Sequence, residues 1–237
     1  MYLEDFNYSL PKNLIAKRPT DRRRSKVLVC CKKKIISFED ILDELDKDDV
    51  LVFNNTKVIP SIIKGFYDNK EIKFTLLQNF HTYFWKVFIK PAKKVKENTV
   101  IKFKNDLYCT VISKKSVIAE VRFNHKYEKV IEYLNKFGNL PLPPYIKYQP
   151  NRDLDEKYYQ TVFAKKIGAV ASPTAGLHFN KTIMKDLKNK KIETIFTTLH
   201  VGIGTFLPLK NNNIKKNTLH KERGVISNEA AKKPAKP

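Results

Sequence analysis

Two histidines in the C-terminal part of the chain are the residues best suited to chemistry, because imidazole exchanges protons near neutral pH. His178 follows the segment Pro-Thr-Ala-Gly-Leu, and His200 lies in Thr-Leu-His-Val-Gly-Ile-Gly-Thr-Phe. Each histidine follows a run typical of a β-strand, and a helical pattern lies between the two runs. A strand–helix–strand order predicts parallel strands, whose carboxyl ends share one edge of a sheet. We therefore expect both histidines in one crevice. For each histidine singly, the alternative is that it holds a loop through backbone hydrogen bonds.

Local patterns predict the elements that position these histidines. The run 169–171 is small and apolar, as in a buried strand. Asn180 is placed to cap a helix whose apolar residues are Ile183 and Leu187. From Ile192 onward the pattern changes to the period of two that a strand requires. Together these segments form a strand–helix–strand unit.

Small and hydroxylated residues accompany the histidines at the predicted crevice. Thr174 and Thr205 are candidate hydrogen-bonding partners of a catalytic base. Gly176, Gly202 and Gly204 would let the backbone approach a ligand closely. The candidate catalytic set is His178, His200 and Thr174.

A third apolar run, 49–53, also ends in polar groups. It is followed by two amides, a hydroxyl and an ammonium group at Asn54, Asn55, Thr56 and Lys57. An ordinary Asn-rich turn is the alternative explanation. Because three strands end in this manner, we expect these four residues to contact a substrate.

The formal charge of the chain is +22, from 46 Lys and Arg against 24 Asp and Glu. A field this positive attracts polyanions, so nucleic acid is the favoured partner, with a lysine-rich coding bias as the alternative. Arg22, Arg23 and Arg24 are candidate RNA-binding residues, because guanidinium groups suit phosphate oxygens. A solvated turn explains this run equally well.

Periodicity changes at Ser61, where short alternating runs begin that continue to Phe123. Turns rich in Lys, Asn and Asp separate them, which predicts a small all-β barrel. Trp85 lies in one of these runs, where a core position is more common than a base-stacking one. A helix over 126–137 follows, with Gly138 at its C′ position. The expected barrel strands are 71–77, 83–89, 100–103, 107–112 and 117–123.

The predicted fold class is α/β, with a barrel-like, incomplete α/β main domain and an inserted small all-β barrel domain. The main domain is discontinuous, over 1–60 and 140–237, and the insert with its trailing helix covers 61–139. In the main domain we also expect a strand over 27–30 and a helix over 38–45 capped by Ser37.

The segment 140–146 contains three prolines, which exclude both a helix and a central strand. It predicts a rigid extended linker that presents Tyr145 to a substrate. A plain connector between domains is the alternative.

Cysteine usage and the N-terminus predict a cytoplasmic protein. Cys30 and Cys31 are adjacent and Cys109 is distant, which matches no zinc spacing and no disulfide framework, so no metal is expected. The N-terminal segment lacks an apolar signal region, and no run approaches membrane-spanning length.

Six motifs occur in the order of a known family: Leu-Ile-Ala with Arg-Pro near the start, Val-Phe-Asn-Asn-Thr-Lys-Val-Ile-Pro, Leu-Pro-Leu-Pro-Pro-Tyr-Ile, Tyr-Gln-Thr-Val-Phe-Ala, Pro-Thr-Ala-Gly-Leu-His-Phe and Thr-Leu-His-Val-Gly-Ile-Gly-Thr-Phe. In these motifs the chain resembles the S-adenosylmethionine:tRNA ribosyltransferase-isomerases of queuosine biosynthesis. The resemblance runs from about residue 3 to about Ala231.

The resemblance implies an α/β, barrel-like domain with an inserted β-barrel, and it implies a reaction. The ribosyl part of S-adenosylmethionine passes to the aminomethyl group of a 7-deazaguanine in tRNA and rearranges to an epoxycyclopentanediol, while adenine and methionine leave. S-adenosylmethionine is then a consumed substrate, no cofactor is needed, and tRNA is the partner. The oligomeric state stays open, with a monomer favoured.

The chain departs from the family at two places. The family usually has Asn-Asp-Thr-Arg where this chain has Asn54, Asn55, Thr56 and Lys57, so Asn55 supplies no negative charge. The family also continues beyond His220-Lys221-Glu222, so we expect a C-terminally truncated chain with low activity.

Two other functions compete with this one. The first is a truncated, catalytically inactive RNA-binding remnant of the same family. The second is an α/β hydrolase, which is disfavoured because no Gly-x-Ser-x-Gly elbow occurs and Ser172 precedes a proline.

Overall fold

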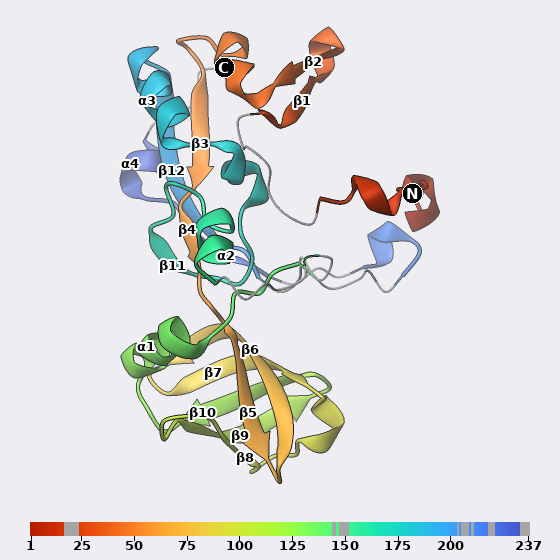
Figure 1. Ribbon diagram of the computed structural model, residues 1–237, viewed down its shortest axis with the longest axis vertical. Coiled ribbons are helices and arrows are strands. Elements are labelled where there is room, and N and C mark those ends of the chain that lie inside the picture. The colour runs from red at the N-terminus through yellow and green to blue at the C-terminus, as the bar shows by residue number, and fades with distance from the viewer. Residues whose placement is uncertain are drawn as a thin grey trace. The chain divides into compact units, whose positions relative to one another are not determined.

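The computed structural model describes residues 1–16, 24–143, 146, 152–202, 204, 209, 211–217 and 221–232, without the side chains of residues 152 and 153. The chain forms two compact units (Figure 1). Residues 58–141 and 168–171 make up the barrel unit. Residues 1–57, 142–167 and 172–237 make up the main unit. The predicted insert, 61–139, falls within the barrel unit.

Six antiparallel strands of the barrel unit close into a barrel in the order β10-β7-β6-β5-β8-β9. The small all-β barrel expected from the alternating runs is therefore confirmed. The sequence pattern did not single out β5, where Ile62 and Ile63 are both buried and break the alternation. The strands are β5 (Ile62–Tyr67), β6 (Lys70–His81), β7 (Phe84–Lys90), β8 (Val100–Lys102), β9 (Tyr108–Lys115) and β10 (Ile118–Phe123), with a short 3-10 helix, η6 (Ala92–Lys94), before β8.

Alternation along β7 shows how the barrel is filled. Trp85, Val87 and Ile89 point into the core, whereas Lys86 and Lys90 are exposed. Burying such apolar side chains contributes roughly 1.5–3 kcal/mol each. Trp85 is 2% exposed, which confirms its core position rather than base stacking.

Helix α1 (Tyr127–Phe137) lies across one end of the barrel and buries Val130 and Leu134 in its core (Figure 1). The predicted helix is therefore confirmed. Gly138, which follows it, does not adopt the left-handed conformation of a C′ glycine, since its φ is −75°. Glycine is needed for another reason: a Cβ atom there would lie 1.9 Å from the carbonyl oxygen of Pro60.

The main unit is built on the sheet β13-β12-β3. β3 (Val50–Asn54) and β12 (Glu193–His200) are parallel, and Val50 pairs with Glu193 and Asn54 with Thr197. β13 (Arg223–Val225) is antiparallel to β12. Both strands expected at 49–53 and after Ile192 are confirmed.

Helix α3 (Lys181–Asn189) confirms the expected helix and its cap. The side chain of Asn180 accepts a hydrogen bond of 2.8 Å from the backbone N–H of Ile183. Ile183 and Leu187 are buried against Phe38 and Phe53. The expected helix over 38–45 is a 3-10 helix, η5 (Phe38–Glu44), and the Ser37 side chain forms no capping hydrogen bond with it.

The predicted strand–helix–strand unit is wrong. β11 (Lys166–Ala169) pairs with β4 (Thr56–Val58) in a separate two-stranded sheet, and the parallel partner of β12 is β3. The sequence pattern identifies the strands, but it contains no information about which of them pair. A four-residue strand such as β11 is too short to signal its partner.

The remaining elements are short. β1 (Lys26–Val29) confirms the strand expected over 27–30 and forms an antiparallel pair with β2 (Lys34–Ser37). No helix in the described part of the chain combines the length and apolar character needed to cross a membrane. Among the described residues, the other helices are η1 (Leu3–Phe6), η2 (Lys12–Leu14), η4 (Cys30–Lys32), α2 (Arg152–Tyr158), η7 (Thr174–His178), η9 (Ile214–Lys216) and α4 (Asn228–Ala231).

The barrel-like α/β main domain is not seen as such. The described strands of the main unit form open sheets of two and three strands. That part of the predicted fold class stays a prediction.

Candidate active site

The candidate site lies in the main unit, where the polar turn after β3 runs beside the end of β12. β12 continues for three residues beyond the last backbone pair, Asn54 with Thr197. The Asn54 side chain extends the ladder: Nδ2 donates to the Leu199 carbonyl at 2.8 Å, and Oδ1 accepts from the Leu199 N–H at 3.0 Å. The turn and the strand end are thus fixed to each other.

Asn55 forms hydrogen bonds with Thr197 and Thr198 of β12. Its Oδ1 accepts a hydrogen bond of 2.7 Å from the hydroxyl of Thr198, and its backbone N–H donates to the Thr197 carbonyl at 2.9 Å. Thr198 is 9% exposed, so this hydroxyl is removed from water. At position 55 the chain therefore provides a hydrogen-bond acceptor without a negative charge.

Thr56 and His200 form the central contact of the site. Thr56 is 1% exposed, and its Oγ1 lies 2.7 Å from Nδ1 of His200 and 3.4 Å from the carbonyl oxygen of Lys166. The hydroxyl can donate to Nδ1 when that nitrogen is unprotonated. It can also accept from a protonated Nδ1 while donating to Lys166. One hydroxyl thereby supports either protonation state of the imidazole.

The surroundings of His200 favour its neutral form. Partial burial, and secondarily the positive charge of Arg223, lower the pKa of His200 below its ordinary value. Arg223 is the residue that pairs with His200 across β12 and β13. A neutral imidazole at physiological pH can accept a proton, which is the property of a general base.

His178 lies in a different environment. It ends η7, and its ring lies 5.3 Å from the ring of Phe38, which also packs against Phe179. The joint crevice was predicted from a strand–helix–strand unit that the structure does not contain. Convergence of His178 and His200 therefore stays a prediction without that support.

The glycines differ in what surrounds them. Gly176 lies against protein rather than open space, since a Cβ atom there would meet Phe163 at 2.9 Å and Thr161 at 3.0 Å. Close packing accounts for this glycine. A Cβ atom at Gly202 would make no close contact, since its nearest neighbour would be Oε1 of Glu222 at 3.9 Å. The N–H of Gly202 donates to the same oxygen at 2.9 Å.

The other predicted residues are accessible or lie outside the described part of the chain. Thr174, Lys57 and Arg24 are exposed, and Gly204 is half-buried. Four further residues with a predicted role lie outside the described part of the chain: Tyr145, Thr205, Arg22 and Arg23.

Three residues of this site were missed by the sequence patterns: Thr198, Lys166 and Arg223. Each is brought to the site by contact between segments that are distant in the sequence; Arg223, for example, lies beside His200 because β13 pairs with β12. Thr198 carried no usable signal, because the alternation in the sequence places it on the same side of the strand as Phe196, which is exposed.

Comparisons with known proteins point to one family. The family described as "Queuosine biosynthesis protein" matches residues 3–236. A S-adenosylmethionine:tRNA ribosyltransferase-isomerase of Sulfurihydrogenibium sp. is 42% identical over 97% of this chain and 69% of that protein. The enzyme of the same name from Finegoldia magna is 40% identical over 97% of this chain and 67% of that protein. The crystal structure of S-adenosylmethionine tRNA ribosyltransferase from Thermotoga maritima is 24% identical, covers 83% of this chain and 58% of that chain, and has a TM-score of 0.33.

Proposed function

The chain belongs to the queuosine biosynthesis protein family, and we propose that it acts as a S-adenosylmethionine:tRNA ribosyltransferase-isomerase. The ribosyl group of S-adenosylmethionine is transferred to the aminomethyl group of a 7-deazaguanine in tRNA. It is then isomerised to the epoxycyclopentanediol of epoxyqueuosine, with release of adenine and methionine. S-adenosylmethionine is a substrate in this reaction, and no separate cofactor is required.

One observation carries the assignment of the reactive centre: the Thr56 hydroxyl lies 2.7 Å from Nδ1 of His200. The reaction needs a base for a hydrogen beside the sulfonium, which that charge acidifies. In the neutral tautomer whose Nδ1–H donates to the buried Thr56 hydroxyl, the unprotonated Nε2 is the proton acceptor. Among the described residues, Nε2 has no hydrogen-bond partner. His200 is therefore the proposed base and Thr56 the residue that positions it.

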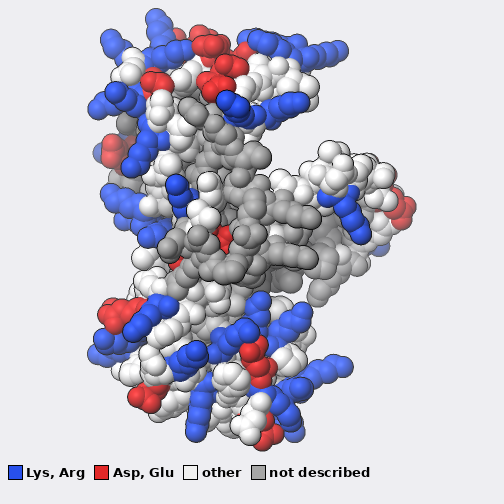
Figure 2. Space-filling view, in the orientation of Figure 1, with Lys and Arg blue, Asp and Glu red and all other residues white. Residues whose placement is uncertain are grey.

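The neighbouring residues have supporting roles in this proposal. Asn54 and Asn55 hold the end of β12, so the imidazole keeps its place when substrate binds. His178 and Thr174, at the two ends of η7, are proposed to contact substrate from that segment. The basic side chains, which are spread over both units on the face drawn in Figure 2, supply a general attraction for tRNA.

At the level of the fold, we propose that the main unit belongs to a barrel-like α/β domain over 1–60 and 140–237, interrupted by the insert over 61–139. The parallel pair β3 and β12 supports this, because parallel strands joined by helical crossovers are the element from which such domains are built.

The test compares His200→Gln with His125→Gln, a matched change of an exposed histidine in the barrel unit. Single-turnover release of adenine from S-adenosylmethionine should fall at least about a hundredfold in His200→Gln, as expected on removal of a general base. The affinity for tRNA should stay unchanged in both variants. A normal rate in His200→Gln would reject the assignment.

A second candidate function is RNA binding without turnover. It is favoured by Asn55, which supplies no charge where the family usually has a carboxylate. Tight tRNA binding by the unmodified chain, with no adenine released until Asn55→Asp restores the carboxylate, would support it.

A further inference from the structure

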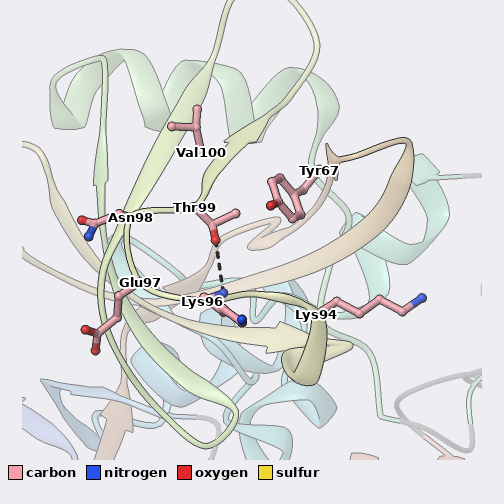
Figure 3. A pocket seen from close by; sticks show the side chains of 7 residues that line it. All are labelled: Tyr67, Lys94, Lys96, Glu97, Asn98, Thr99 and Val100. Atoms are coloured by element: carbon pink, nitrogen blue, oxygen red, sulfur yellow. Dashed lines mark hydrogen bonds between the residues drawn. The ribbon is translucent and has the colours of Figure 1, made fainter.

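A pocket of about 370 Å³ lies in the barrel unit, where the loop from β7 to β8 approaches the end of β5. It is lined by Tyr67, the last residue of β5, and by residues of the segment 94–100 (Figure 3). All of these residues are described, and all belong to the barrel unit. The residues of the candidate active site belong to the main unit, so this pocket shares no lining residue with that site.

The loop that forms one wall of the pocket is held in place before any ligand arrives. The ammonium group of Lys114 donates to the carbonyl oxygens of Ala92 at 2.7 Å and Val95 at 2.5 Å. The Val95 side chain is fully buried in the barrel core. Further along the loop, the N–H of Asn98 donates to the carbonyl of Val111 at 2.8 Å. A wall fixed in this way loses little conformational entropy on binding.

The pocket combines an aromatic surface with cationic groups. Tyr67 is 41% exposed, and the exposed residues Lys94 and Lys96 line the same pocket (Figure 3). Within the described part of the chain, neither lysine forms an ion pair. The Glu97 carboxylate is directed away from Tyr67 and accepts from the N–H of Lys114 at 3.2 Å.

A polar group completes the lining. The hydroxyl of Thr99 accepts a hydrogen bond of 3.1 Å from the N–H of Lys96 (dashed in Figure 3), and this leaves its own proton to donate to a ligand. Val100, 41% exposed, adds apolar surface beside it. A flat ring, two ammonium groups and a hydroxyl donor match a ligand that has a planar apolar face and an anionic group.

We infer that this pocket binds one nucleotide of a single-stranded RNA segment, with its base against Tyr67 and its phosphate between Lys94 and Lys96. Stacking on aromatic side chains together with lysine contacts to phosphates is how proteins hold single strands without reading their sequence. The inference rests on the proposed function, in which RNA is the substrate. It adds a contact on the barrel unit that positions RNA and does not take part in the reaction.

Fluorescence anisotropy of the full chain with a labelled single-stranded oligoribonucleotide tests the aromatic contact. Tyr67→Ala should weaken binding about tenfold, which is the usual effect of losing one stacked base. Tyr67→Phe keeps the ring and should bind normally. Tyr108→Ala, which removes a tyrosine of similar exposure from β9, is the matched control and should also bind normally. If Tyr67→Ala and Tyr108→Ala bind equally well, the stacking assignment is overturned.

A salt series tests the phosphate contact. The double variant Lys94→Gln/Lys96→Gln should reduce the slope of log K against log salt by about 1.4, at roughly 0.7 per lysine for single-stranded RNA. Lys86→Gln/Lys126→Gln removes the same charge from exposed positions that do not line the pocket, and should change the slope less. Equal slopes in the two double variants would overturn the assignment.

Two further measurements distinguish a failure of the pocket assignment from a failure of the proposed function. Single-turnover adenine release at saturating tRNA should stay unchanged in all pocket variants, because the pocket is not the reaction site. Normal release combined with unchanged affinity would reject the pocket alone, whereas an unmodified chain that binds no RNA would reject the proposed function as well. A labelled polyglutamate peptide that binds as tightly as RNA, and is weakened by the same variants, would show that the pocket takes acidic peptides instead.

Discussion

The barrel unit and the main unit are stabilised in different ways. In the barrel unit a large apolar cluster fills a closed sheet, and side chains such as Phe74, Ile72 and Leu76 have no exposed surface. The main unit has a smaller cluster around Phe38 and Phe53, and much of its order near β3 and β12 comes from side-chain hydrogen bonds. The proposed reaction thus takes place in the unit that depends more on polar contacts, and the proposed RNA contact in the unit that depends on packing.

The largest effect is expected from a cavity in the barrel. Phe74→Ala should lower the free energy of unfolding of the barrel unit by about 3–5 kcal/mol, since Phe74 is fully buried. The single tryptophan of the chain, Trp85, lies in this core, so its fluorescence during urea unfolding reports on the barrel unit. Phe66→Ala, at a 48% exposed position, is the control and should change the free energy by less than about 0.5 kcal/mol. Equal losses in the two variants would contradict the packing account.

A smaller effect, confined to the main unit, is expected from Thr56→Val. The substitution keeps the shape of the side chain but removes the partner of His200 Nδ1. Adenine release should slow about tenfold, which corresponds to about 1.4 kcal/mol, the scale of one hydrogen bond. The Trp85 unfolding transition should not move. Thr56→Ser retains a hydroxyl and should recover most of the rate; if the serine variant is as slow as the valine variant, the hydroxyl is not the relevant group.

The smallest effect is expected in the pH dependence. Partial burial and the charge of Arg223 lower the pKa of His200, so the folded chain resists protonation and loses stability relative to the unfolded chain as pH falls below about 6.5. The acidic limb of the rate profile should therefore lie below the ordinary histidine value. Arg223→Gln removes the second cause and should move this limb to higher pH, while Lys221→Gln, an exposed neighbour, should leave it in place. A limb that does not move in Arg223→Gln would exclude this coupling.

The two units also differ in how far the sequence predicts them. In the barrel, alternation such as that of Trp85, Val87 and Ile89 is local, and most strands pair with a neighbour in sequence, so the patterns were sufficient for five of its six strands. Strand β5 was missed because two adjacent isoleucines, Ile62 and Ile63, are both buried and break the alternation.

In the main unit the strands were predicted, but their partners were not. β3 and β12 pair across more than a hundred residues, and no periodicity encodes that choice. The same holds for the candidate site, where the residues could be predicted but their contacts could not. His200 and Thr56 were selected because of their residue types at strand ends, whereas their 2.7 Å contact, and the place of Arg223 beside them, depend on the pairing.

The two adjacent amides after β3 look equivalent in the sequence, but the structure gives them different tolerances to replacement. Asn54 uses both ends of its side chain, donating to the Leu199 carbonyl and accepting from the Leu199 N–H. A carboxylate there would face a carbonyl oxygen with no proton to offer, so only an amide fits. Within the described residues, the Asn55 side chain bonds only through its oxygen, which accepts from Thr198, and a carboxylate accepts equally well. Replacing Asn55 by Asp would therefore keep the acceptor for the Thr198 hydroxyl, whereas the same change at Asn54 would lose the donor to the Leu199 carbonyl.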